Sequence, residues 1–428
     1  MPRIDISERD LTQATGTVGT DIPYIPGFTT SESAPSYPVL CASISDFEAL
    51  FGETPVVFSE DNDSYSIKSK DFDRSYIMAK ELLAKGMPVY YHAIVKPSAV
   101  EKSTHPIETF TAALTNYLSK ESDNGEGMLA DKDEYTVKYL TSGGYHNYGT
   151  GIDTKLLNIA ATRGDCVALI EDKQTQSLDP LSTNCFWNSL CSPTAISTEH
   201  DEFGAAFTPW AYYRPAKKYG ELKEILMPAC FGYLADLAVN IKTSPNWLAM
   251  AGTTRGIVPS ISRTACSGRL SNTLANKYQP TKAAEGVNGG ARAVNAITDI
   301  KPYGLTIWGN RTLKAIGEEG LTATNFLNTR NMISDIKKVA YRAAKAQLFE
   351  QNSETLWLNF KADVSPFLDQ LKRGNGISDY KLLKLDTKYN GNSLGKEEFA
   401  CAIKIYPLYA VESFEITVVV SDNDVAVG

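Results

Sequence analysis

Hydrophobic and polar positions along the first 170 residues alternate between a helical period and strand-like runs. Apolar residues at helical spacing predict four helices in this part of the chain, over 45–51, 72–85, 106–118 and 156–163. Gly52, Gly86 and Gly164 follow three of them and are expected to end them. Strand composition is seen at residues 88–95 and 135–140, between helices, and at 166–170, after the last of them. Strands alternating with helices predict an α/β fold, layered and with at least partly parallel pairing.

Two long helices are predicted in the last third of the chain. The first spans about 329–351 and has one apolar side, which consists of Met332, Ile333, Ile336, Val339, Ala340, Ala343 and Ala346. Its other side carries a basic stripe, which consists of Arg330, Lys337, Lys338, Arg342 and Lys345. Such a stripe is either a solvated face or a contact to an acidic partner. The second helix opens at Ser353 and ends at Gly374, with an expected kink or restart at Pro366. The apolar sides of the two helices are expected to pack together.

Strand patterns follow these helices and also occur near both ends of the sequence. Residues 381–386 and 399–405 have strand composition, and they supply Leu383, Leu385, Cys401, Ile403 and Ile405 to a candidate sheet that would receive a further strand. Near the C-terminus every second residue is apolar, at Phe414, Ile416, Val418 and Val420, which predicts a strand. Near the N-terminus Ile4 and Ile6 show the same spacing over a shorter stretch. The last three strands could close into one sheet within the chain. Alternatively, the two terminal strands are donated to other copies, which would cover an apolar edge that is otherwise prone to aggregate.

Charge, hydropathy and cysteine spacing argue against a nucleic-acid-binding protein, a membrane-inserted protein and a disulfide-stabilised protein. The 428 residues carry a formal net charge of −8, which argues against nucleic acid as a direct partner. No apolar run approaches the ~20 residues that cross a bilayer, so membrane insertion is not expected. The seven cysteines are scattered without a C-x-x-C spacing, and reduced thiols are the simplest interpretation.

The chemistry-bearing patterns that would indicate an enzyme are missing. The sequence has no Walker A loop, no G-x-S-x-G elbow and no H-E-x-x-H motif. The four histidines lie far apart, and none has a second metal ligand at a typical spacing. Glycine-rich residues 143–151 lack the Lys-Ser/Thr of a phosphate loop and are interpreted as a loop. We therefore expect no cofactor, no metal and no catalytic residues, and an α/β enzyme with an unrecognised active site is the alternative.

Several sequence blocks in the last third occur in a recognisable order. Residues 305–313 read LTIWGNRTL, 328–330 read NTR, 348–352 read LFEQN, 356–357 read LW and 407–416 read PLYAVESFEI. Together they resemble the C-terminal domain of contractile-tail sheath proteins, the subunits that stack around the inner tube of a phage tail, an R-type bacteriocin or a related injection device. Residues 51–52, 163–172, 207–210 and 228–235 resemble blocks of the same family more faintly, and Cys230-Phe231 departs from its Ser-Gly.

The resemblance implies a domain organisation: an N-terminal extended arm (1–22), an outer α/β domain (23–300), an inner domain with two helices and a sheet (301–411), and a C-terminal arm strand (412–428). It implies that arms of neighbouring subunits complete that sheet, with Ile4, Ile6, Phe414, Ile416, Val418 and Val420 as arm residues. It also implies that the helix carrying the basic stripe faces the inner tube.

The resemblance further implies a structural subunit that polymerises helically around a tube and contracts to drive the tube through a target envelope. Its expected partners are other copies of itself, the inner tail tube protein, and baseplate and tail terminator proteins. The expected location is a virion tail or contractile particle, assembled in the cytoplasm of a bacterial host.

Overall fold

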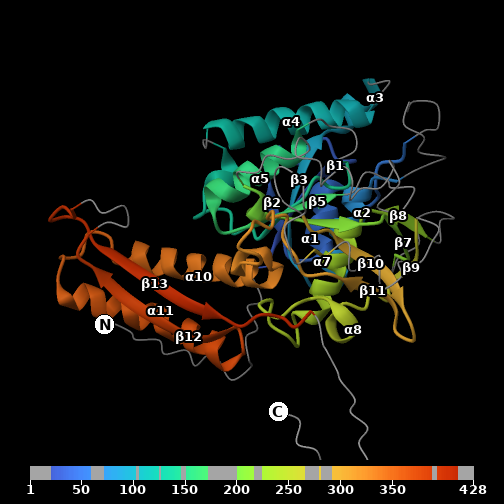
Figure 1. The fold of residues 1–428 in the computed structure, drawn as a ribbon. Helices are drawn as coiled ribbons and strands as arrows, with labels where there is room; N and C mark the ends of the chain where they lie inside the picture. The colour runs from blue at the N-terminus through green and yellow to red at the C-terminus, as the bar shows by residue number, and fades with distance from the viewer. Residues whose placement is uncertain are drawn as a thin grey trace, which may run out of the picture.

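An eight-stranded mixed sheet forms the centre of the larger part of the molecule (Figure 1). The computed structural model describes residues 21–58, 72–102, 106–124, 127–145, 151–171, 200–215, 224–265, 279–280, 292–387 and 393–412. The strands of this sheet are β1 (Pro23–Phe28), β2 (Val39–Cys41), β3 (Val89–Val95), β4 (Tyr139–Leu140), β5 (Val167–Glu171), β6 (Gly204–Thr208), β10 (Asn295–Ile300) and β11 (Gly304–Trp308). Their order is β11-β10-β6-β5-β4-β1-β3-β2. The six central strands run parallel, and β2 and β11 pair antiparallel at the two edges.

Helices cover both faces of this sheet. One face packs against α1 (Ile44–Phe51), α2 (Arg74–Ala84) and α7 (Ala229–Asn240). The other packs against α4 (Pro106–Asn124) and α5 (Ile152–Arg163). Strands buried on both faces need apolar side chains at nearly every position, which is why 166–170 has no polar alternation. The predicted α/β class is confirmed.

Shorter elements surround this layer. They are α3 (Pro97–Lys102), α8 (Gly252–Arg255), the 3₁₀ helices η2 (Met128–Ala130), η4 (Asp201–Phe203) and η5 (Ala323–Asn325), and a three-stranded antiparallel sheet of β8 (Ile225–Met227), β7 (Ala211–Tyr213) and β9 (Ile261–Thr264). The side-chain amide of Asn240, the last residue of α7, donates hydrogen bonds to the Asp236 carboxyl one turn earlier and to the carbonyl of Arg255 in α8.

A second unit projects from the sheet layer and has its own core (Figure 1). It consists of α10 (Leu327–Ala346), α11 (Glu354–Arg373), β12 (Ile377–Leu385) and β13 (Ala400–Pro407). The two helices pack through Met332, Ile336, Phe360, Val364 and Leu368, as their apolar sides predict. Trp247 from the first unit completes this core, and its indole donates to the carbonyl of Gly374 at 3.0 Å.

Two of the predictions concern Pro366 and the boundary between the units. α11 runs through Pro366 without a restart, and the alternative of a kink there stays a prediction. The boundary predicted between residues 300 and 301 falls inside the β10–β11 hairpin, and both strands belong to the large sheet. We therefore propose that the second unit begins near Thr322, where Thr322 and Asn325 form a capping box ahead of α10.

The buried carboxyl of Asp236 gives the fold an expected pH dependence. Asp236 is 5% exposed, and burial raises its pKa to about 8, above the usual value near ~3.9 of an unfolded chain. Since folding favours the protonated form, its stabilising contribution is complete below pH ~4 and is lost as the pH rises through about 8. We expect Asp236→Asn to flatten the fall in unfolding free energy between pH 6 and pH 9, measured by urea denaturation. Exposed Asp363→Asn is the control and should keep the wild-type slope; an unchanged slope in Asp236→Asn would contradict the assignment.

Candidate assembly surfaces

The turn at residues 308–313 joins the large sheet to the second unit. The side-chain amide of Asn295 in β10 forms two hydrogen bonds of 2.8 Å with the backbone of Arg311: it accepts from the N–H and donates to the carbonyl. Asn310 donates to the side chain of Asn328 in the first turn of α10 at 2.6 Å. On the other side, the N–H of Leu313 donates to the carbonyl of Gly204 in β6 at 2.8 Å. The turn therefore fixes the start of α10 relative to two strands of the sheet.

The Arg311 side chain also holds the segment that follows β13. It is 1% exposed, lies over the Phe326 ring at 4.7 Å, and its Nε donates to Glu412 at 2.8 Å. The Tyr409 ring lies 5.3 Å from that of Phe326. A bidentate guanidinium–carboxylate pair is a strong, directional contact. It fixes the segment from Tyr409 to Glu412 against Phe326 and the 308–313 turn.

The predicted strands 381–386 and 399–405 form the β12–β13 hairpin. The strands pair antiparallel with Leu382 opposite Ile403, and within the described residues neither strand has a second neighbour. Cys401, Ile403 and Ile405 pack partly buried against the second core. Leu383 is 44% exposed and, with Leu385, lies on the opposite face because side chains alternate along a strand. The five residues predicted to belong to the receiving strands thus lie on both faces of the hairpin, and the receipt of a further strand stays a prediction.

The predicted arm residues lie outside the described part of the chain. This applies to Ile4, Ile6, Phe414, Ile416, Val418 and Val420. Their pairing with the hairpin of another copy stays a prediction.

The basic stripe of α10 is turned toward the first unit, and for two of its residues the predicted outward orientation is wrong. Arg330 is 2% exposed, pairs with Glu202 at 3.0 Å and lies over the Phe203 ring at 4.3 Å. Lys338 is 5% exposed and donates to the carbonyl of Val137 at 2.9 Å. Helical periodicity assigns residues to sides of a helix, but it cannot tell that a second layer of the same chain covers the polar side.

The other three members of the stripe remain at the surface. Lys337 and Arg342 are exposed along a cleft of about 570 Å³ between α10 and the end of α5. Lys345 is also exposed and pairs with Asp133 at 2.6 Å. Of the five residues in the stripe, only these three can contact another molecule while α10 stays packed against the first unit.

A buried polar cluster joins the two units at this junction. The ammonium of Lys138, in the loop that leads into β4, pairs with Asp335 of α10 and donates to the carbonyl of Asn331 at 2.9 Å. The Asn246 amide donates to Asp335 at 2.8 Å and to Asp21 at 2.7 Å. All four side chains are at most 4% exposed. Buried charges persist only when paired and hydrogen-bonded, so this cluster locks α10 to the sheet layer.

Electrostatics in the cluster follow from its burial. Burial raises the pKa of Asp21 to about 6, against the lowering effect of Lys138. The pKa of Lys338 is lowered to about 8, first by burial and then by the positive charge of Lys138. This cluster was not predicted from the sequence. Its signal was present in Lys138 inside a predicted strand and Asp335 as one of two acids on a basic helix.

Features that might have served an enzyme have structural partners. A Cβ on Gly143 would lie 2.1 Å from the carbonyl oxygen of Pro26, so this glycine permits a close backbone approach. The N–H of Gly144 donates to the buried Glu171 carboxylate at 3.0 Å and does not face an open phosphate site. His92 is buried and bonded to Tyr24 at 2.9 Å, and burial lowers its pKa to about 4.

The described residues contain no group of three or more His, Cys, Asp or Glu side chains that could hold a metal ion. No helix among them is both long and apolar enough to cross a membrane.

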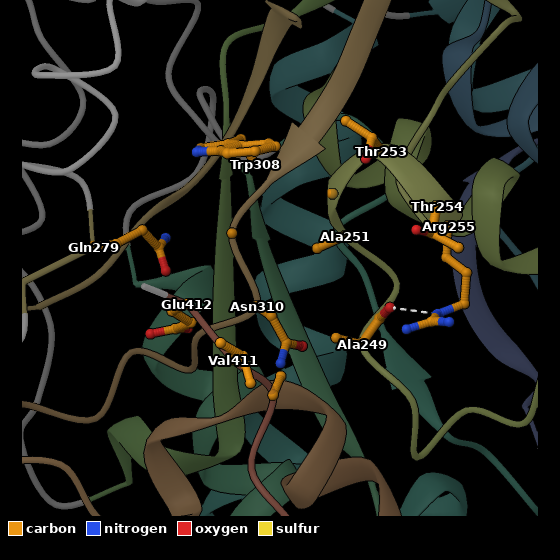
Figure 2. Close-up of a pocket in the computed structure, with 13 residues that line it drawn as sticks. Ala249, Ala251, Thr253, Thr254, Arg255, Gln279, Trp308, Asn310, Val411 and Glu412 are labelled. Carbon is orange, nitrogen blue, oxygen red and sulfur yellow. Dashed lines mark hydrogen bonds between the residues drawn. The ribbon is translucent and has the colours of Figure 1, made fainter. Parts of the chain in front are cut away.

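A cavity of about 580 Å³ opens where the first unit, the 308–313 turn and the chain after β13 meet (Figure 2). Trp308 lies on one side of it, and Ala251 and Thr253 from the α8 region lie on the other. Val411 and Glu412 form part of the remaining wall. We call this cavity the Trp308 groove.

Comparisons with known proteins agree with this architecture. The family described as phage tail sheath C-terminal domain matches residues 322–421, which begin at the capping box before α10. The tail sheath protein of Vibrio phage KVP40 is 22% identical over 277 residues, covering 62% of this chain and 38% of that protein. The chain therefore spans well under half the length of that relative.

Two solved structures share the fold over nearly their whole length. A chain from the contracted-state baseplate of the anti-feeding prophage has a TM-score of 0.63 and 17% identity, with 99% of each chain covered. A chain from the contracted sheath complex of PVC, an extracellular contractile injection system, has a TM-score of 0.57 and 14% identity, with 98% of this chain and 97% of that chain covered. The chain is thus similar in sequence to a tail sheath protein, shares its fold with chains of contractile particles, and matches the phage tail sheath C-terminal domain family over residues 322–421.

Proposed function

We propose that this protein is the structural subunit of a contractile sheath, which polymerises helically around an inner tube and contracts to drive the tube through a target envelope. The observation that carries the proposal is the second unit, which matches the sheath C-terminal domain and presents a two-stranded hairpin with an unpaired edge on each strand within the described residues. An unpaired strand edge is a template for a strand from another chain.

The proposal assigns partners and sites. Copies of the chain bind one another through terminal arms, with residues 1–20 and 413–428 adding strands to the β12–β13 hairpin of neighbours. A baseplate starts the polymer, a terminator ends it, and the inner tube lies against the exposed part of the stripe, namely Lys337, Arg342 and Lys345. The particle is a virion tail or related contractile device assembled in a bacterial cytoplasm. No step of this function calls for catalysis.

Truncation tests the arms. Deleting residues 1–20 or 413–428 leaves Glu412 and its pair with Arg311 in place, so the fold is expected to survive while long tubes disappear. Circular dichroism reports the fold, and sedimentation with negative-stain imaging reports assembly. Full-length protein that forms only discrete particles would count against the sheath proposal itself. Truncated protein that still forms long tubes would remove the donated strands and leave the sheath proposal standing.

A further inference from the structure

The connection between α10 and α11 exposes two large apolar side chains. Leu348 is 63% exposed and Phe349 is 102% exposed. Phe349 also has a φ of +68°, a left-handed conformation that glycine or asparagine usually adopts at a helix end. The connection is held in place because the Asn352 amide donates to the carbonyls of Lys396 and Glu398 at 3.1 and 3.0 Å. A benzyl group held in water on a strained backbone lowers the stability of the isolated chain and points to a contact made elsewhere.

The Trp308 groove is a receptor of suitable size and chemistry. Its 580 Å³ is in the range of about 300–1,000 Å³ that accommodates compact apolar groups. Trp308, Ala249, Ala251 and Val411 supply apolar wall, and Val411 is 68% exposed. Figure 2 shows these side chains around an open space.

The exposed pair and the groove lie at opposite ends of α10. Asn310 in the groove bonds to Asn328 in the first turn of α10, and Leu348 follows its last turn. A helix of 20 residues is about 30 Å long, so the two sites cannot meet within one chain. Two different patches that bind each other on successive copies make a head-to-tail contact, which propagates into an open helical assembly when the rotation does not close a ring.

Charges at the two sites are complementary. Glu350 follows Phe349, is exposed and forms no ion pair with the described residues. Arg255 in the groove wall uses its Nε to bond the carbonyl of Ala249 at 2.9 Å, and no described carboxylate pairs with it. The neighbouring charges are already committed, since Glu412 pairs with Arg311 and Lys345 pairs with Asp133.

We propose that Leu348 and Phe349 of one copy insert into the Trp308 groove of a second copy, with Glu350 pairing with Arg255 of that copy. The inference rests on the proposed function, because it names a contact within the polymer. It is distinct from strand donation, since it uses side chains of the helical connection and no strand edge.

Substitution of Phe349 separates folding from assembly. Phe349→Gly relieves the left-handed strain, so its thermal midpoint should equal or exceed that of wild type. The variant also lacks the ring that is proposed to be buried in the groove of the next copy. The protein concentration needed for tubes should therefore rise roughly ten- to hundredfold. Tyr303→Ser, which removes a 52% exposed ring from the β10–β11 turn, is the matched control and should assemble as wild type does. Assembly of Phe349→Gly at the wild-type concentration, or equal loss in Tyr303→Ser, overturns the proposal.

A charge exchange tests the pairing of the two patches. Glu350→Arg and Arg255→Glu should each weaken assembly, and the double variant should recover most of the loss. A double variant that adds the two losses instead would show that these residues are not partners.

A photo-crosslinker at position 349 identifies the receptor directly. Crosslinks in assembled full-length protein are expected to residues 249–255 and 308–310 of another copy. Tubes whose crosslinks map elsewhere overturn this contact but not the sheath function. Concentrated protein that gives neither tubes nor intermolecular crosslinks overturns both.

Discussion

An Asp335→Ala variant should lose up to about 3–5 kcal/mol of unfolding free energy, because it removes the closer counter-charge of the buried Lys138 ammonium and leaves only Asp21, 3.9 Å away. The same change removes an acceptor from the Asn246 amide, which then bonds only Asp21. Since the cluster lies between the two units, amide hydrogen exchange should accelerate first in α10 and in the segment around Lys138. Urea denaturation and exchange together measure the effect.

Two further variants control this experiment. Asp363→Ala removes an exposed carboxylate from α11 and should change stability by no more than about 0.5 kcal/mol. Replacing both partners, in Lys138→Met with Asp335→Leu, should be less destabilising than Asp335→Ala alone, because no buried ammonium remains and the Asp21 carboxyl, whose pKa burial already raises, can stay protonated. If Asp335→Ala is as stable as Asp363→Ala, the cluster does not hold the two units together.

Charge reversal on α10 should have very different effects on the unfolding free energy at two residues that lie four positions apart, Lys338 and Arg342. Lys338→Glu places a carboxylate against the Val137 carbonyl in a site where the wild-type side chain is 5% exposed, and we expect a loss of about 3–5 kcal/mol or failure to fold. Arg342→Glu changes an exposed residue and should stay within about 0.5 kcal/mol of wild type. Chemical denaturation of the two purified variants makes the comparison.

The same pair then tests the proposed tube contact. Folded Arg342→Glu should load onto inner tubes less well than wild type, and the deficit should shrink as salt screens the charge. Normal loading of Arg342→Glu at all salt concentrations would indicate that the exposed residues of the stripe are merely solvated. Lys338→Glu of wild-type stability would contradict the buried position of Lys338 itself.

The local sequence pattern was sufficient to predict those helices whose periodicity and boundary residues lie within the same short window. α4 and α5 combine helical periodicity with a boundary residue, Pro106 or Gly164, and they lie where those signals place them. β1 was missed, because two prolines and a glycine in Pro23–Phe28 imitate a loop. Its glycine is required by packing, since a Cβ on Gly27 would lie 2.0 Å from the Ser75 hydroxyl. Such a reason depends on a neighbour 48 positions away and is invisible in a local window.

The candidate sites show the same limit. The hairpin strands were predicted, but the register that sets Leu383 against Ala402 and turns Cys401 toward α11 arises from pairing and packing. The stripe on α10 was found, whereas the layer that covers Arg330 and Lys338 belongs to a distant part of the chain. The Trp308 groove combines four segments separated by up to about 160 positions, so no motif could have indicated it.

The β12–β13 hairpin has a kinetic consequence. Lys381 and Lys404 are exposed directly opposite each other on its outer face, and like charges in that arrangement repel. Two free copies that meet hairpin to hairpin would add to this repulsion, so we expect accidental pairing in a concentrated solution to be slow. In the proposed assembly, a strand presented from a fixed direction by the end of a polymer would not bring a second pair of these lysines. We therefore expect the start of a polymer to depend on the template that presents the strand more than on the concentration of free subunits.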